Sequence, residues 1–252
     1  MLSFELTEEQ KALVDETRRF TKEKIIPIAA ECDRKHTFPN DVFKEAWEMG
    51  LVAPGIPTEY GGNGVGEVEH VLITEELAYG CTGIQTSFTA NTLAATPILV
   101  AGTEAQKKKY LGMLTAEPIF AAYAITEPAA GSDAAGIQSR AVKDGNDYIV
   151  TGSKCFITNG AWATWYTAFA TVDPALGHKG IIAFIVDRDA PGVSVGKTED
   201  KLGQRASNTA VINFDEVRIP AANILAEPGH GFKVAMQTFD RTRPDIAAGA
   251  CG

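Results

Sequence analysis

The sequence predicts an α+β protein of more than one domain, in which an all-α helical N-terminal domain precedes an antiparallel β-barrel or sandwich domain. Two changes of pattern along the 252 residues predict this architecture. Residues 1–118 have helical spacing of apolar side chains, residues 119–229 have short alternating segments between turns, and helical spacing returns over residues 230–252. Strands that follow one another without intervening helices pair antiparallel, which excludes a parallel nucleotide-binding sheet.

The helices of the first domain are predicted from their start signals and their periodicity. Thr7 and Thr103 are each followed three residues later by glutamine, the pattern of a capping box, so one helix begins after each threonine. The first of these helices is expected to kink at Pro27. Further helices are expected over residues 40–49, 67–79 and 85–100.

The second domain is predicted to hold about six strands separated by turn residues. The candidates are residues 148–150, 155–157, 164–172, 180–186, 192–197 and 210–217. Residues 192–196 also match the GxSxG pattern of hydrolases. Val193 and Val195 alternate as in a strand, however, which favours a strand with an outward Ser194 over a nucleophile elbow.

Composition and charge exclude several classes of protein. The chain is 45% hydrophobic and 22% charged, and no apolar run approaches the roughly 20 residues that span a bilayer. A net charge of −9 argues against a nucleic-acid partner. Four cysteines and four histidines are scattered, so neither a disulfide framework nor a metal site is expected. Residues 1–5 lack the features of an import signal, which is expected to have been removed or never to have existed.

One segment has the composition of an anion-binding loop. Residues 123–136, YAITEPAAGSDAAG, predict a strand that runs into a loop of small residues. Such a loop lets backbone N–H groups and one hydroxyl approach an anionic group closely, as in phosphate-binding nests. An ordinary turn of small residues explains the segment equally well.

A second segment places an aromatic ring and a hydroxyl on one face of a strand. In residues 154–160, KCFITNG, Phe156 and Thr158 are two residues apart, and side chains two apart on a strand share a face. An aromatic ring can cover a flavin while the hydroxyl donates to a ring nitrogen, which tunes the readiness of the cofactor to accept hydride. Taken alone, Phe156 is more often a core residue.

Together the two segments resemble the acyl-CoA dehydrogenase family, and most closely its medium-chain members. Further motifs stand in the family's order at residues 56–62 (IPTEYGG), 75–80 (EELAYG), 201–205 (KLGQR), 229–232 (GHGF) and 239–244 (FDRTRP). The resemblance implies FAD-dependent α,β-dehydrogenation of fatty acyl-CoA thioesters to trans-2-enoyl-CoA in β-oxidation. It also implies that the last predicted helix is the first of a C-terminal four-helix domain, most of which this chain lacks.

In this family the two segments hold FAD. The resemblance therefore implies cofactor contacts at Tyr123, Ile125, Thr126, Gly131, Ser132, Phe156, Ile157 and Thr158. Phe156 stands where many relatives have tryptophan, and Thr158 is expected near the reactive ring nitrogen. Substrate contacts are implied at Thr89, Ser132, Asp240, Arg241, Thr242 and Arg243. Thr89 falls where the closest relatives have a polar residue at the base of the acyl pocket.

The family's reaction needs a carboxylate base, and the chain has none at the family's positions. The base removes the α-proton while the β-hydrogen leaves as hydride to the flavin. Most members carry it late in the C-terminal domain, and a minority carry it at the position of Thr242, which cannot act as a base. Glu127 belongs to the signature of members with their base elsewhere, so we interpret it as structural. The chain alone is expected to have no catalytic residue and no activity.

The resemblance also implies partners and a compartment. Electron-transferring flavoprotein is the expected electron acceptor, docking on an apolar patch where Val65 and Ile73 fall, and simple packing explains both residues as well. The full-length protein is expected to be a homotetramer in the mitochondrial matrix, with the bacterial cytoplasm as the alternative. Alternative functions are a truncated homologue that binds flavin or a partner without catalysis, and an acyl-CoA oxidase or flavin monooxygenase of the same fold.

Overall fold

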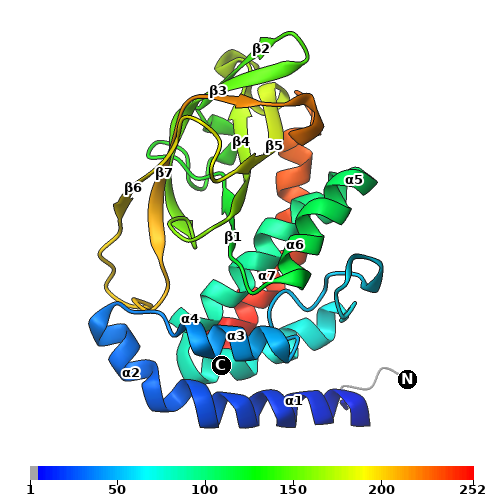
Figure 1. Cartoon of the computed structure of the whole chain (residues 1–252), viewed down its shortest axis with the longest axis vertical. Helices are drawn as coiled ribbons and strands as arrows, with labels where there is room; N and C mark the ends of the chain where they lie inside the picture. Colours follow the sequence, from blue (N-terminus) through cyan, green and yellow to red (C-terminus); the bar gives the residue numbers. More distant parts are fainter. Residues whose placement is uncertain (1–4) are drawn as a thin grey trace.

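Helices gather in one half of the molecule and strands in the other (Figure 1). The computed structural model describes residues 5–252, so most of the opening segment considered for an import signal lies outside the described residues. Helices α1 to α6 precede Glu117, strands β1 to β8 follow, and α7 closes the described chain. The predicted order of a helical domain, a strand-rich domain and a final helix is confirmed.

The first helix begins at the predicted capping box. Thr7 Oγ1 accepts the N–H of Gln10 at 3.2 Å, and Gln10 Oε1 accepts the N–H of Thr7 at 3.0 Å. α1 (Glu8–Phe20) continues through a π-helical turn (Thr21–Ile25) into α2 (Ile26–Lys35). Because proline lacks an N–H and its ring crowds the preceding turn, the irregularity expected at Pro27 falls on the turn before it.

The two helices expected over residues 67–79 and 85–100 form one element, α4 (Glu67–Ala101), which is broken at Cys81. Cys81 has φ −168° and ψ 108°, so its backbone is extended between two helical halves. α3 (Asn40–Glu48) precedes α4, and the capping box of Thr103 opens α5 (Glu104–Gln106), which continues through a π-helical turn into α6 (Gly112–Ala116). Within residues 5–252, no helix is long and apolar enough to cross a membrane.

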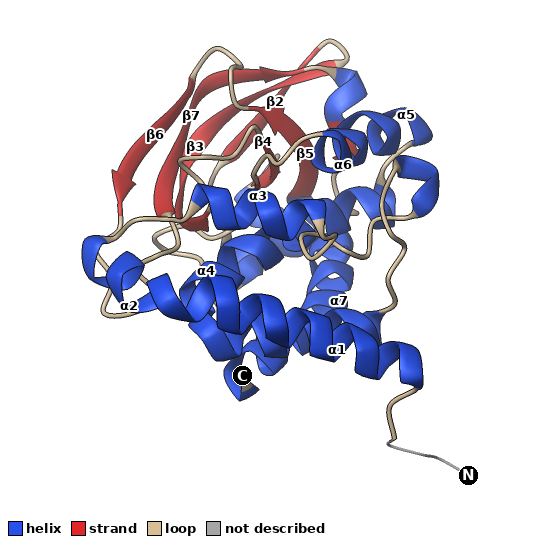
Figure 2. Ribbon diagram, turned by 60° about the horizontal axis from the view of Figure 1, so that its bottom comes forward, coloured by secondary structure: helices blue, strands red, loops and turns tan. Residues whose placement is uncertain are grey.

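Within the described chain, eight strands form one mixed sheet that curves over the helices (Figure 2). They are β1 (Ala121–Ala124), β2 (Arg140–Asp144), β3 (Asp147–Thr158), β4 (Trp165–Thr171), β5 (Ile181–Asp187), β6 (Val193–Thr198), β7 (Thr209–Ile219) and β8 (Ile224–Ala226). The order is β6-β7-β3-β2-β4-β5-β8, with β1 beside β4. Most neighbours are antiparallel as predicted, but β1 and β2 each lie parallel to β4.

Two details of the strands bear on the sequence predictions. The candidates at residues 148–150 and 155–157 are a single strand, β3, because Gly152 pairs with Phe214 of β7 instead of forming a turn. A Cβ at Gly152 would lie 2.2 Å from Ser139 Oγ, so glycine allows the close approach of a neighbouring segment. Ser194 of the GxSxG match is exposed and lies within β6, as expected for a strand.

Buried asparagines join α4 to the strands that carry the predicted cofactor residues. Asn91 is 1% exposed; its Nδ2 donates to the Ile119 carbonyl at 2.8 Å and its Oδ1 accepts the N–H of Ala121 at 2.9 Å. At the end of β3, Asn159 Nδ2 donates to the Ser87 carbonyl at 2.8 Å. α4 therefore holds the start of β1 and the end of β3 in place.

Asn91→Ala is expected to lower the free energy of unfolding by about 2–4 kcal/mol, because it leaves a buried N–H and a buried carbonyl without partners. Urea unfolding followed by circular dichroism measures the change. The control is Asn63→Ala, an exposed asparagine with one long contact of 3.5 Å to Gly50, for which a change within about 0.5 kcal/mol is expected. Equal losses in the two variants would show that Asn91 does not tie the domains together.

Candidate functional site

An ion pair lies inside the strand-rich domain. Lys154 Nζ of β3 is 2.6 Å from Glu127 Oε1 and also donates to the Ile125 carbonyl at 3.2 Å. The same carboxylate accepts the N–H groups of Gln138 at 2.6 Å and Ser139 at 3.0 Å. Lys154 is 0% exposed and Glu127 6% exposed. Glu127 therefore joins the loop after β1 to β3 and to the segment that leads into β2.

The charges of this pair favour a structural role for Glu127. Burial by itself would raise the pKa of its carboxyl, but Lys154 and the N–H donors outweigh burial and hold that pKa below its usual range. Burial lowers the pKa of the Lys154 ammonium to about 8, against the opposing effect of Glu127. Both groups are charged at neutral pH, and a carboxylate that is saturated with donors is poorly suited to accept a proton.

The motifs alone predict no role for Lys154, although the pattern of β3 contains a signal for it. Tyr148 and Val150 are buried in β3, and Lys154 lies an even number of residues from both. The two-residue period therefore places Lys154 on the buried face, where an ammonium requires a carboxylate partner. Glu127 is the acidic residue of the neighbouring motif.

The small-residue loop leaves β1 beside β3. The N–H of Cys155 donates to the Thr126 carbonyl at 2.9 Å, and the N–H groups of Glu127 and Ala130 each donate to the other's carbonyl, at 3.0 and 3.1 Å. The turn closed by this bridge leads to exposed Gly131 and Ser132. A Cβ at Gly131 would meet nothing within 4 Å, so the loop presents open backbone. Such a loop suits an anionic group that approaches the N–H groups closely.

A β-bulge turns Phe156 out of the sheet. From Lys154 to Ile157, β3 has one residue more than the facing part of β7. Phe156 takes a left-handed φ of 57°, and its side chain is 64% exposed whereas Ile157 is 2% exposed. Thr158 is half-buried. An exposed phenyl ring on a strained backbone is costly, and a flat ligand stacked on the ring would offset that cost.

Three predicted cofactor residues have their side chains in the core: Tyr123, Ile125 and Ile157 are 7%, 6% and 2% exposed. The Tyr123 ring lies 5.2 Å from Phe169 and 5.8 Å from Phe239 of α7 (Gly231–Cys251). Burial raises the pKa of its hydroxyl, which has no hydrogen-bond partner in the part of the chain that the structure describes. Cofactor contacts by Ile125 and Ile157 would therefore use the backbone.

The predicted substrate residues of α7 point in different directions. Asp240 and Arg243 are exposed, with Arg243 Nη1 3.8 Å from Asp240 Oδ1 and its guanidinium above the Phe239 ring. Thr242 is 8% exposed, and together with Arg241 it lines a separate cavity against α4.

The residues predicted on α4 and its preceding loop have unequal exposure. Thr89 is half-buried, and its Oγ1 accepts a hydrogen bond from Gln85 at 3.1 Å. Ile73 was predicted to lie on a docking patch, but it is 2% exposed and packs with Leu77 and Phe20. The prediction that a partner docks on Ile73 is therefore wrong, because this face of α4 points into the core. Val65 is only partly buried against the same cluster.

Glu127→Gln is expected to lower the free energy of unfolding at pH 7 by about 3–5 kcal/mol, because it leaves a buried ammonium without its counter-charge. The folded pKa of Glu127 lies below the unfolded value of 4.5, so its contribution is present above that pH and is lost as the pH falls through the folded pKa. Unfolding measured from pH 7 to pH 3 should show this loss in the wild type and not in the variant.

Two further variants separate the ion pair from general effects of substitution. Glu117→Gln changes an exposed glutamate that precedes β1 and is expected to change the free energy of unfolding by less than about 0.5 kcal/mol. The double variant Glu127→Gln, Lys154→Met removes both charges and should recover much of the loss. A double variant as unstable as Glu127→Gln would contradict the role of Glu127 as the counter-charge of Lys154.

Comparison with known proteins follows the same division of the chain. The model of the acyl-CoA dehydrogenase N-terminal domain matches residues 7–117, and that of the middle domain matches residues 122–217. The probable medium-chain specific acyl-CoA dehydrogenase 2, mitochondrial, of Caenorhabditis briggsae is 48% identical over 100% of this chain and 62% of its own length. The acryloyl-CoA reductase (NADH) of Anaerotignum propionicum is 40% identical over 100% of this chain and 64% of its own length. The chain thus spans less than two thirds of these relatives.

Solved structures agree in fold. The butyryl-CoA dehydrogenase of Megasphaera elsdenii superposes with a TM-score of 0.94 at 38% identity, over 99% of this chain and 66% of that chain. A chain from a structure of the electron transferring flavoprotein of Acidaminococcus fermentans superposes with a TM-score of 0.94 at 39% identity, over 99% of this chain and 66% of that chain.

A flavin is present in another similar structure. The glutaryl-CoA dehydrogenase of Mycobacterium smegmatis, determined in complex with FADH2, gives a TM-score of 0.89 at 30% identity, over 97% of this chain and 62% of that chain. The helical and strand-rich halves of the molecule match the two domain models in the same order, and the chain therefore belongs to the acyl-CoA dehydrogenase family of oxidoreductases.

Proposed function

We propose that this chain forms the FAD-binding part of a dehydrogenase that introduces an α,β double bond into fatty acyl-CoA thioesters. The observation that carries the proposal is the hydrogen bond from the Cys155 N–H to the Thr126 carbonyl. It joins β3, which carries exposed Phe156 and half-buried Thr158, to the segment that leads into the open Gly131–Ser132 loop. An exposed aromatic ring, a half-buried hydroxyl and open backbone fit the ring and the pyrophosphate of FAD. Family membership supports the same cofactor.

Each group of this site has a task that follows from its geometry. Phe156 would cover one face of the flavin ring and exclude water, and the Thr158 hydroxyl would donate to a ring nitrogen. The N–H groups and the hydroxyl at Gly131 and Ser132 would hold the pyrophosphate, and Ser132 also remains a proposed substrate contact. Lys154 and Glu127 keep both segments in register. When bound, FAD supplies the acceptor for hydride.

The chain alone is expected not to abstract the α-proton. Glu127 is held as an anion by Lys154, Asp240 is exposed near Arg243, and Thr242 donates its hydroxyl proton to the Thr238 carbonyl at 3.0 Å. Burial, followed by the charge of Glu67, raises the pKa of Asp245 to about 7, as a general base requires. Its carboxylate is 2% exposed and faces His70, however, so substrate does not reach it. We propose that the base belongs to a part of the enzyme outside these residues.

We also propose electron-transferring flavoprotein as the electron acceptor and the mitochondrial matrix as the compartment. The similar Caenorhabditis briggsae protein is described as mitochondrial, whereas other relatives come from mycobacteria. A full-length homotetramer remains part of the proposal. Because Ile73 is packed in the core, the acceptor would use other residues of the helical domain.

The visible spectrum of the chain reconstituted with FAD tests the function. Bound flavin that stays oxidised after anaerobic addition of butyryl-CoA or octanoyl-CoA is the expected result. Failure to bind FAD would overturn the proposal. Bleaching would place a base within these residues, and repeating the addition with Asp245→Asn and Glu127→Gln would identify it. After reduction with dithionite, rapid reoxidation by O2 would favour the alternative acyl-CoA oxidase.

Phe156→Ala is expected to weaken FAD binding by about five- to thirtyfold, because it removes the aromatic cover of the ring, worth about 1–2 kcal/mol. Titration of FAD fluorescence measures the dissociation constant. Phe156→Trp keeps an aromatic ring and should retain the affinity. Val142→Ala, which trims a 59% exposed side chain on β2, serves as the control. Equal affinities of the alanine and tryptophan variants would contradict a stacking role for Phe156.

A further inference from the structure

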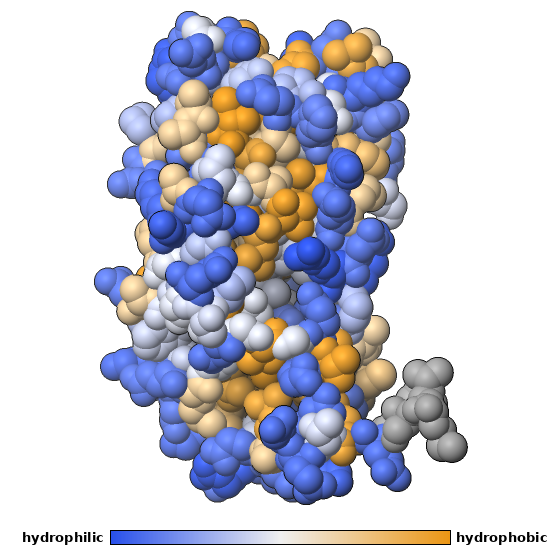
Figure 3. Space-filling model, turned by 90° about the vertical axis from the view of Figure 1, so that its right-hand side faces the viewer, coloured by the Kyte–Doolittle hydropathy of each residue, from blue (hydrophilic) through white to orange (hydrophobic). Residues whose placement is uncertain are grey.

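A separate cavity of about 270 Å³ lies between α4, α7 and the loop of residues 53–65. The segments proposed for FAD, residues 123–132 and 156–158, contribute nothing to its lining. Its lining elements lie on the right of Figure 1, and Figure 3 shows that side of the molecule with a hollow near its middle, bordered by apolar and charged residues. Its volume is slightly below the range typical of sites for drug-sized ligands, so it suits a smaller molecule.

One wall of the cavity is apolar, and the buried histidine that lines it is uncharged. Ile56, Ala95 and Leu99 form the apolar wall. His70 is 4% exposed, and its Nδ1 lies 3.3 Å from Asp245 Oδ2. Burial lowers the pKa of the His70 imidazole to about 4, so the ring is neutral at physiological pH and offers a hydrogen bond instead of a charge.

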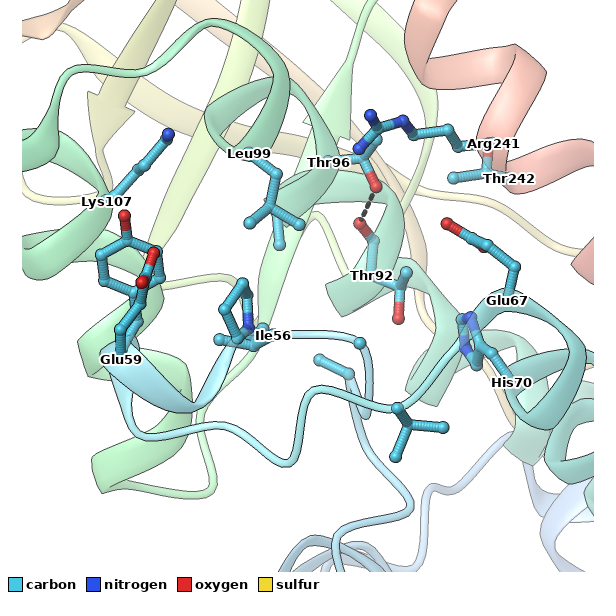
Figure 4. A pocket seen from close by; sticks show the side chains of 16 residues that line it. Ile56, Glu59, Glu67, His70, Thr92, Thr96, Leu99, Lys107, Arg241 and Thr242 are labelled. Atoms are coloured by element: carbon cyan, nitrogen blue, oxygen red, sulfur yellow. Dashed lines mark hydrogen bonds between the residues drawn. The ribbon is translucent and has the colours of Figure 1, made fainter. Parts of the chain in front are cut away.

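Three polar groups at the cavity have neither an ion pair nor a hydrogen bond to another side chain within residues 5–252. The Arg241 guanidinium and the Glu67 carboxylate form no ion pair there, with each other or with another residue, and Thr92 Oγ1 is buried without a hydrogen bond. In Figure 4, Arg241 reaches in from α7 and Glu67 from the start of α4, with Thr92 and Thr96 between them. Thr96 Oγ1 donates to the Thr92 carbonyl at 2.7 Å, so its hydroxyl oxygen can still accept.

The charged groups at the other end of the cavity have partners of their own. Lys107 lies 3.6 Å from Glu104, and the Tyr60 hydroxyl donates to Glu104 at 3.0 Å. Glu59 lines this end too, and its carboxylate acts on the Tyr60 hydroxyl. At the opposite end, Arg241 and Glu67 are one cation and one anion without an ion pair, next to an unpartnered hydroxyl. A simple carboxylate would pair with Arg241 and be repelled by Glu67, and a simple amine would meet the opposite problem.

We propose that this cavity binds a free amino acid with an apolar side chain. Its carboxylate pairs with Arg241, its ammonium pairs with Glu67, and the Thr92 hydroxyl hydrogen-bonds to the same head group. The side chain packs on Ile56, Ala95 and Leu99. A zwitterion satisfies both unmatched charges at once, and both ion pairs are charge-assisted hydrogen bonds.

Binding of L-leucine to the FAD-loaded chain tests the proposal. The probe is compared by calorimetry with 4-methylpentanoate, which lacks the ammonium, and with 3-methylbutylamine, which lacks the carboxylate. We expect saturable binding of leucine and affinities at least about tenfold weaker for each half-molecule. Arg241→Gln and Glu67→Gln should each weaken leucine binding by at least about tenfold. Lys233→Gln and Glu75→Gln, exposed substitutions on the same two helices outside the cavity, should leave it unchanged.

Threonine methyl signals of the wild-type chain give a readout that does not depend on the folding of variants. Leucine should shift the resonances of Thr92 and Thr96, with little change at Thr158. A leucine affinity equal to that of either half-molecule, an affinity unchanged in both cavity variants, or shifts at Thr158 without shifts at Thr92 would overturn the proposal. No binding up to about 10 mM, an affinity weaker than that of typical metabolite sites, would also overturn it.

Discussion

The ion pair between Lys154 and Glu127 is the interaction on which the proposed cofactor site depends. It places opposite charges in the interior of the strand-rich domain, where an unpaired charge would cost several kcal/mol. The Glu127 carboxylate also accepts two backbone N–H groups, so that one side chain joins three chain segments. The loop that follows Glu127 and the strand that carries Lys154 are the two segments that would contact FAD. The relative position of these two segments is thus determined by an ion pair in the core, beneath the surface proposed to bind FAD.

The bulge in β3 makes the Phe156 ring accessible to a ligand, which the proposed cofactor site also requires. A regular strand would continue the alternation of Tyr148, Val150 and Lys154 and would bury Phe156 in the core. One extra residue between Lys154 and Ile157 reverses the alternation, so the aromatic ring reaches the surface and the isoleucine takes its place inside. The strained φ of Phe156 is the cost of this reversal, and the strain is located where the proposed ligand binds.

Helix α4 serves both the proposed flavin site and the separate cavity. Asn91 and Ser87 hold β1 and the end of β3, whereas Thr92, Thr96 and Leu99 line the cavity against α7. A helix can do this because residues three and four apart share a face while their immediate neighbours point elsewhere. A ligand in the cavity would therefore contact the same rigid element that orients the cofactor segments.

Local sequence determined much of the fold. Capping boxes at Thr7 and Thr103 place two helix starts, and the change from helical to alternating periodicity at about residue 118 predicts the order of the domains, because both signals depend on neighbouring residues alone. The motifs likewise predicted a flavin-binding family. Long-range contacts decided the rest: the parallel pairing of β1 with β4, the single strand through Gly152, the burial of Ile73 and the separation of Arg241 from Arg243. Strand register, bulges and the packing of one helix face depend on partners distant in sequence, which local periodicity does not encode.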